Sequence, residues 1–298
     1  MKILIIGRTG QIGAELCQLL ARNHIPYMAP TREELDITRP EQIEKILTEY
    51  RPQFVVNTAG YRSPNGAEIE RLLCFKVNRD AVAHLAKACD QHNATLLHIS
   101  SWRVFPGNSR KSSYTEKDTP MPADVLGSSF WQGEQKVCEF CPKHIILRLS
   151  WVLSYRSRNR FSLYVYCMRN KTILPAYKER FGNPTTALDV ARAILAIFRQ
   201  LACGAKVWGT YHYSAEGIVS ETFLAETIRA EACKVQPEQE WVAIYPDDNA
   251  VNIKPKRYAC LDSSLLRDTF GIHPPGWRES IAYLVRTNIN NISDIRGR

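Results

Sequence analysis

The sequence predicts an α/β fold in which helices flank a doubly wound parallel sheet. Residues 2–6 form a short apolar run rich in β-branched side chains, which is typical of a strand buried on both faces of such a sheet. A glycine turn follows, and residues 11–23 then carry apolar side chains at helical spacing. Because similar strand and helix patterns alternate as far as about residue 154, we expect parallel strands joined by crossover helices.

The turn after the first strand, GRTGQIG, has glycines at a GxxGxxG spacing. Glycines allow a tight turn and let backbone N–H groups approach a pyrophosphate, while the helix N-terminus offers unpaired donors. An ordinary strand-to-helix turn is the alternative, but the flanking strand and helix favour a nucleotide. We therefore expect a Rossmann-type dinucleotide site whose turn residues are Gly7, Arg8, Thr9, Gly10, Gln11, Ile12 and Gly13.

A short second strand is predicted at residues 26–28, and Arg32 lies in the segment that follows it. In dinucleotide folds a carboxylate near this point usually binds the ribose 2′-hydroxyl, whereas an arginine suits a 2′-phosphate. Arg8 and Arg32 could bind that phosphate together. We therefore expect NADP(H) in preference to NAD(H).

The remaining elements follow from the same patterns. Up to residue 154 we expect helices at about 40–50, 67–92 and 123–141, and strands at 54–57, 95–100 and 145–149. Beyond it we expect helices at 161–170, 188–201, 221–233 and 277–286, a turn at 182–184 and a strand at 209–213. We assign 1–154 and about 183–206 to the dinucleotide domain, about 155–182 and 207–287 to a smaller C-terminal substrate lobe, and 288–298 to a frayed tail.

The composition argues against several classes of protein. No apolar run approaches the ~20 residues that a membrane-spanning helix needs, and no signal peptide is recognisable, so we expect a cytoplasmic protein. Nine cysteines without a framework spacing indicate small core residues in a reducing compartment. Cys138 and Cys141 form a CxxC with no second pair to complete four ligands, and we expect no metal site.

The net charge of +9 is concentrated in residues 143–182, where nine basic residues stand against the single acid Glu179. Such a segment attracts a nucleotide-sugar, another anionic ligand, nucleic acid or an acidic protein, or it forms a solvated basic face. We consider nucleic acid the weakest of these alternatives, because the sequence lacks a helix-turn-helix or RNA-recognition motif.

The order of ten motifs resembles the extended short-chain dehydrogenase/reductase superfamily, and within it the dTDP-4-dehydrorhamnose reductase branch. These motifs are GRTGQIG, ELDIT, NTAGY, FKVNRDA, ISSWRVFPG, GEQKV, LRLSWV, FGNPTTALDVA, GTYHYSAEG and LDSSLLRDTFGI. The resemblance covers nearly the whole chain. It implies a dinucleotide-binding fold and a reductase that passes hydride from a nicotinamide to the ketone of a dTDP-linked sugar.

The resemblance also implies where the chemistry occurs. In that family a tyrosine hydroxyl protonates the ketone oxygen, a lysine lowers the pKa of the phenol and holds the ribose, and a serine or threonine hydrogen-bonds the ketone. The hydroxyl position falls here on Ser101, but the tyrosine and lysine positions fall on Leu126 and Phe130. Because neither of these side chains donates a proton, we expect the ordinary mechanism to be lost unless Tyr114 or Lys136 replaces them.

Other positions carry over from the family by motif. The implied cofactor contacts are Asp36, Ile37, Ala59, Gly60, Tyr61, Asn78 and Ser100, and the implied substrate-side residues are Arg62, Trp102, Arg103, Arg148, Ser150 and Trp151. Asn78 could instead be a buried structural amide, and Trp151 a core aromatic. Arg62 and the Trp102–Arg103 pair depart from the family pattern, which indicates a refitted pocket.

Three functions remain in competition. The first is an NADP(H)-binding member of the family that has lost standard reductase chemistry and controls a protein partner. The second is an active NADPH-dependent nucleotide-sugar reductase with replacement catalytic residues. The third is a nucleic-acid-binding regulator on the same fold. The sequence is also compatible with a homodimer and gives no reason to expect a membrane partner.

Overall fold

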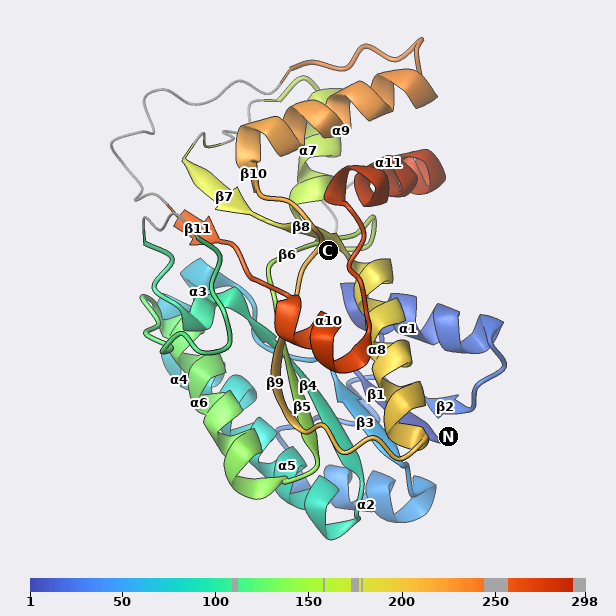
Figure 1. The fold of residues 1–298 in the computed structure, drawn as a ribbon, viewed down its shortest axis with the longest axis vertical. Coiled ribbons are helices and arrows are strands. Elements are labelled where there is room, and N and C mark those ends of the chain that lie inside the picture. The colour runs from blue at the N-terminus through green and yellow to red at the C-terminus, as the bar shows by residue number, and fades with distance from the viewer. Residues whose placement is uncertain (109–111, 158, 173–176, 178, 244–256, 292–298) are drawn as a thin grey trace.

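The computed structural model describes residues 1–108, 112–157, 159–172, 177, 179–243 and 257–291. A six-stranded sheet forms the centre, with helices on both of its faces and a smaller lobe beyond one end (Figure 1). Within the described ranges, no helix combines the length and the apolar character that crossing a membrane requires.

All six strands of the sheet run parallel, in the order β2-β1-β3-β4-β5-β9, which confirms the predicted doubly wound sheet. They are β2 (Tyr27–Met28), β1 (Ile3–Ile6), β3 (Phe54–Asn57), β4 (Thr95–Ser101), β5 (His144–Leu149) and β9 (Gly209–Tyr213). Every residue of β1, β3 and β5 is buried, because helices cover both faces.

The two faces of the sheet have separate cores. Helices α1 (Gln11–Arg22) and α8 (Ala187–Ala202) pack on one face, where Ile3 and Ile5 join the buried side chains. Helices α2 (Pro40–Tyr50), α5 (Ala81–Gln91) and α6 (Val125–Phe140) cover the other face, where Leu4 and Ile6 point. This division follows from the alternation of side chains along a strand.

The expected helix over residues 67–92 is wrong, because the structure breaks it into four parts. These are α3 (Pro64–Ile69), α4 (Arg71–Phe75), a π-helical turn η1 (Lys76–Asp80) and α5. The backbone leaves helical geometry at Glu70, where φ is −101° and ψ is 46°. The π-helical turn places Asn78 against the loop that follows β3, and such turns often lie at functional sites.

The boundary of the smaller lobe also needs correction. Residues 209–213 were expected in that lobe, but β9 pairs with β5 as the sixth strand of the main sheet, with Ile145 opposite Gly209. Helix α10 (Ser264–Phe270) likewise places Leu266 and Phe270 in the core beneath α1 and α8. The chain therefore returns from the lobe to the sheet twice, which local sequence patterns do not reveal.

In the ranges that the structure describes, the smaller lobe is built from short strands and helices. Its elements are β6 (Trp151–Leu153), α7 (Arg160–Arg169), β7 (Arg180–Gly182), β8 (Pro184–Thr186), β10 (Val219–Ser220), α9 (Glu221–Val235), β11 (Arg257–Ala259) and α11 (Trp277–Asn288). Strands β10, β7 and β11 form one small sheet, and β6 pairs with β8. In Figure 1, α7, α9 and α11 gather at the end of the molecule away from α2 and α5.

The C-terminal segment is more ordered than expected at its start. A 3₁₀ turn, η4 (Ile289–Asn291), continues α11, and Ile289 is fully buried. The guanidinium of Arg169 donates a hydrogen bond to the Ile289 carbonyl at 3.0 Å. The frayed tail predicted from residue 288 is therefore wrong for residues 288–291, and residues 292–298 lie outside the described part of the chain.

Candidate functional site

The turn between β1 and α1 has the close packing that its glycines predict. Gly7 has φ +90°, a left-handed conformation that favours glycine. A Cβ on Gly13 would lie 2.3 Å from the Gly7 carbonyl oxygen, so the helix starts directly against the end of the strand. Gly10 is the N-cap of α1 and has no side chain to cap the first N–H groups. These donors can face a bound anion, so the turn fits a pyrophosphate.

Arg8, next to Gly7, extends toward the second strand. Its Nη1 donates to the Ala29 carbonyl at 3.1 Å, one residue beyond β2. Arg32 is exposed a few residues further on and lies near Asp36. Partial burial acts to raise the pKa of Asp36, but hydrogen bonds from the N–H and hydroxyl of Thr38 lower it overall. The structure thus brings Arg8 to the segment that holds Arg32, where a 2′-phosphate was expected.

The loop after β3, Ala59 to Tyr61, is held by Asn78. The side-chain oxygen of Asn78 accepts from the Tyr61 N–H at 2.8 Å, and its NH₂ donates to the Tyr61 carbonyl at 3.1 Å and to Ser129 Oγ at 2.9 Å. Asn78 is only 2% exposed. It is a buried structural amide, as the alternative interpretation proposed, and it shapes the loop expected on the cofactor side.

Arg62 lies elsewhere than on the predicted substrate side. Its guanidinium is beside the glycine turn, within 4.0 Å of the position that a Cβ on Gly10 would occupy, and it donates a hydrogen bond to the Thr58 carbonyl. Strands β1 and β3 are neighbours, with Ile6 opposite Asn57, so the loops that follow them lie side by side. A long side chain on one loop therefore reaches the other.

Leu126 and Phe130 occupy the first two turns of α6. Leu126 is 2% exposed and packs with Ala67, Cys74 and Val125 beneath α3 and α4. Phe130 is partly buried, and its Cε1 is 3.9 Å from the position of a Cβ on Gly60. Position 130 therefore faces the loop expected on the cofactor side, and both positions carry hydrocarbon.

Ser101 and Ser100 end β4 and point to opposite faces of the sheet. The Ser101 hydroxyl accepts a hydrogen bond from the Arg103 N–H at 3.3 Å and is partly exposed. The Ser100 hydroxyl instead donates to Glu134 on α6 and is 4% exposed. Ser100 is therefore occupied beneath α6, whereas Ser101 is available for the predicted hydrogen bond to a substrate ketone.

Arg148, expected on the substrate side, forms an internal ion pair. Its Nη2 is 2.6 Å from Glu134 Oε2, and the two side chains are 4% and 1% exposed. Its Nη1 donates to His212 Nε2 at 3.5 Å, and burial is the main cause that lowers the pKa of His212 to about 3. The imidazole is therefore neutral. Sequence patterns did not reveal the role of Arg148 because its partners lie 14 and 64 residues away.

Ser150, Trp151 and Trp102 are also buried. The Ser150 hydroxyl donates to the Ala259 carbonyl at 2.6 Å. Trp151 is 3% and Trp102 8% exposed, and both belong to the core of the lobe. For Trp151 this is the core-aromatic alternative. All three residues therefore stabilise the junction between the sheet and the lobe.

Arg103 joins a cluster that sequence analysis missed in part. Its Nη1 is 2.6 Å from Asp124 Oδ2, and Nη1 of Arg257, on β11, is 3.3 Å from the same oxygen. The other oxygen of Asp124 accepts from the Gly127 N–H at 2.7 Å, which caps α6. Asp124 lies at the start of the helix predicted over residues 123–141, where an aspartate is a recognisable cap, but its pairing with a lobe arginine is visible only in three dimensions.

Comparison with known proteins identifies the family. The sequence profile of the RmlD substrate binding domain matches residues 1–289. The chain belongs to this family. It is 33% identical over 285 residues to a dTDP-4-dehydrorhamnose reductase from Aggregatibacter actinomycetemcomitans, covering 94% of this chain and 97% of that protein.

Two solved structures resemble this RmlD-family chain along nearly its full length. A dTDP-4-dehydrorhamnose reductase from Clostridium acetobutylicum has a TM-score of 0.84 and 26% identity, and covers 96% of this chain and 98% of that chain. One from Bacillus anthracis, solved in complex with NADP, has a TM-score of 0.83 and 26% identity, and covers 95% and 96%. They confirm the Rossmann-type fold and the predicted branch.

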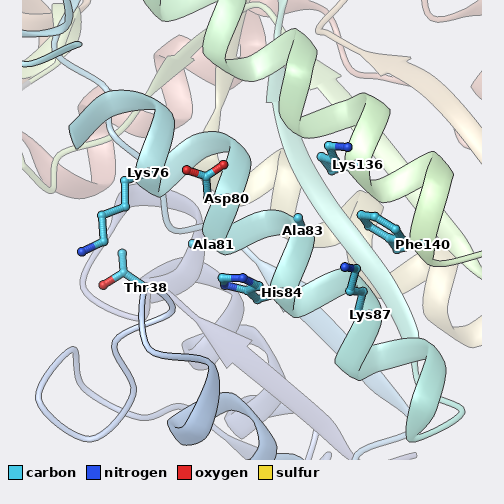
Figure 2. A pocket seen from close by; sticks show the side chains of 9 residues that line it. All are labelled: Thr38, Lys76, Asp80, Ala81, Ala83, His84, Lys87, Lys136 and Phe140. Atoms are coloured by element: carbon cyan, nitrogen blue, oxygen red, sulfur yellow. The ribbon is translucent and has the colours of Figure 1, made fainter. Parts of the chain in front are cut away.

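Both candidate replacements have other partners in this RmlD-family chain. Tyr114 is 3% exposed and stacks on Phe105 with ring centroids 4.4 Å apart. Lys136 pairs with Glu139 at 2.6 Å. Lys136 also lines a groove of about 580 Å³ between η1, α5 and α6. Figure 2 shows it there near Lys87 and Phe140.

The basic segment of this RmlD-family chain is largely paired with acids from elsewhere in the sequence. Besides Arg148, the ion pairs are Arg156–Glu15 at 3.6 Å, Arg160–Glu221 at 2.7 Å, Lys171–Glu240 at 2.6 Å and Arg180–Glu221 at 3.8 Å. Part of the segment, including Arg158 and Lys178, lies outside the described residues. Across the described ranges, the structure has no group of three or more His, Cys, Asp and Glu placed to hold a metal.

Proposed function

We propose that this RmlD-family chain is an NADPH-dependent reductase of a dTDP-linked 4-keto-6-deoxysugar. The observation that carries the proposal is the glycine cradle of residues 7–13, which is closed so tightly that a Cβ on Gly13 would collide with the Gly7 carbonyl. The named reductases that match this chain over nearly its full length support the reaction, and the NADP complex of one of them supports the cofactor.

The residues present fit a dinucleotide. Gly10 and the first N–H groups of α1 would receive the pyrophosphate, Arg8 and Arg32 a 2′-phosphate, and the loop of Ala59, Gly60 and Tyr61 the adenosine and ribose side. A bound nicotinamide supplies the hydride. The loop is already fixed by Asn78, so binding orders little further backbone.

The reduction also consumes one proton, which the alcohol oxygen of the product receives. Leu126 and Phe130 cannot supply it, and the Tyr61 hydroxyl donates to Glu70, which raises the pKa of Tyr61 to about 12. We propose that the Ser101 hydroxyl hydrogen-bonds the ketone oxygen and that water delivers the proton there. Without a positioned acid, we expect a rate roughly 10²–10⁴ below that of a relative with the tyrosine and lysine.

A second function is favoured by one specific observation. Leu126 is packed in an apolar cluster and Phe130 faces the loop at Gly60, so both side chains make apolar packing contacts at the positions where the chemistry was expected. A chain that keeps the dinucleotide site but has lost the chemistry would act as a cofactor-dependent binding or regulatory protein.

One experiment separates the two functions. Purified protein is mixed with NADPH and dTDP-4-dehydrorhamnose, NADPH oxidation is followed by absorbance, and NADPH binding is measured in parallel. Turnover that falls on Ser101→Ala supports the reductase. Saturable binding without turnover supports the regulatory function, and the absence of both contradicts the two proposals together.

A further inference from the structure

A guanidinium lies directly over the glycine turn. Nη1 and Nη2 of Arg62 are 3.9 and 4.0 Å from the position of a Cβ on Gly10, the N-cap of α1. The side chain hydrogen-bonds only a backbone oxygen, that of Thr58, among the described residues. Arg62 is exposed as a whole residue, but its guanidinium lies in a desolvated position, and this burial lowers the pKa of Arg62.

The charges around this guanidinium are one-sided. The N-terminus of α1 carries the positive end of the helix dipole and unpaired N–H groups. Arg62 forms no ion pair with a carboxylate in the described parts of the chain, although other arginines near the site, Arg103 and Arg148, each have one. Two positive centres side by side favour an anion between them.

We propose that Arg62 binds the pyrophosphate of the dinucleotide, opposite the N–H groups of α1. The planar guanidinium presents paired donors that match two phosphate oxygens. This inference rests on the proposed function, because it assigns a residue to the same cofactor site. It also gives position 62 a reason to depart from the family pattern, since Phe130 provides no cation near the cofactor and Arg62 provides one from the neighbouring loop.

The experiment measures binding and does not depend on turnover. Dissociation constants for NADPH are determined by calorimetry for the wild type, Arg62→Ala and Arg62→Lys. Adenosine 2′-monophosphate serves as the second probe because it lacks the pyrophosphate. Arg71→Ala, which removes an exposed arginine from α4, is the matched control for net charge. Thermal melting curves show whether each variant is folded.

We expect Arg62→Ala to weaken NADPH binding on the order of 10- to 100-fold, as the loss of charge-assisted hydrogen bonds to phosphate implies. Arg62→Lys should retain part of the affinity, and Arg71→Ala all of it. Binding of adenosine 2′-monophosphate should change less than about two-fold in Arg62→Ala, because this probe has no pyrophosphate for Arg62 to bind.

Unchanged NADPH affinity in Arg62→Ala, or an equal loss for both probes, would overturn the inference and leave the proposed function standing. Tighter NADPH binding in Arg62→Ala would also overturn it, because the guanidinium would then occupy the cofactor's space. If the wild type binds no NADPH, the inference and the proposed function both fail. If Arg62→Ala does not fold, the comparison of Arg62→Lys with the wild type decides the matter, with no loss of NADPH affinity counting against the inference.

Discussion

The ring of Phe130 lies against the backbone of Gly60, with its Cε1 3.9 Å from the position that a Cβ on Gly60 would take. The two residues come from the first turns of α6 and from the loop after β3. Position 130 therefore faces the loop expected on the cofactor side, although it carries hydrocarbon. Leu126, one helical turn earlier, belongs to the apolar cluster under α3 and α4, and Phe130 packs against the same cluster.

Restoring the family pair should therefore restore proton delivery. The double variant Leu126→Tyr, Phe130→Lys is expected to oxidise NADPH with dTDP-4-dehydrorhamnose about 10²-fold or more faster than the wild type. Overpacking at the buried position 126 should lower the free energy of unfolding by about 1–3 kcal/mol. Phe130→Lys alone is the control, because it adds the charge without the acid. A folded double variant no faster than that control would show that other parts of the site have also changed.

The buried ion pair of Glu134 and Arg148 should couple strongly. Removing one partner, as in Arg148→Met, leaves an unpaired buried charge and should lower the free energy of unfolding by about 3–5 kcal/mol. The double variant Glu134→Leu, Arg148→Met should recover much of that loss. Urea denaturation of the four proteins in this cycle gives the coupling energy, and additive single effects would contradict the prediction.

Asp124 should stabilise both the helix and the junction with the lobe. Asp124→Ala removes the cap of α6 and leaves Arg103 and Arg257 without their shared carboxylate, so we expect a loss of about 1–3 kcal/mol in the free energy of unfolding. Asp268→Ala breaks an exposed pair with Arg267 and should change stability by less than about 1 kcal/mol. Equal losses of the free energy of unfolding for the two substitutions, measured by chemical denaturation, would contradict a stabilising role of the Asp124 cluster.

Acid should destabilise the fold partly through His98. Burial is the main cause that lowers the pKa of His98 from 6.5 to about 4, so the unfolded chain takes up a proton that the folded protein does not. Above pH 6.5 His98 is neutral in both states and does not lower the free energy of unfolding. As the pH falls from 6.5 toward 4, protonation of the unfolded chain lowers the free energy of unfolding. Between pH 7 and pH 5 the contribution should be about 2 kcal/mol. His98→Leu should therefore reduce the pH dependence of unfolding by that amount, and a variant that keeps the wild-type pH dependence would contradict the prediction.

Local patterns were sufficient for the strand, turn and helix of residues 3–22 and for the parallel sheet, because each signal lies within a few residues. Pairings across the fold could not be predicted this way. The π-helical turn at Lys76–Asp80 places Asn78 against Tyr61, 17 residues away. Arg148 finds its partner on another element, and β9 joins the sheet only after the chain has crossed the lobe. Arg62 reaches the glycine turn because two loops are neighbours in the sheet order.

The most direct test of the account is a titration of the purified chain with NADPH and with NADH. We expect saturable NADPH binding, weaker NADH binding, and a loss of both in Gly13→Ala, whose added methyl group would meet the Gly7 carbonyl at 2.3 Å. A folded wild-type protein that binds neither nucleotide, or a Gly13→Ala variant that binds them unchanged, would contradict it.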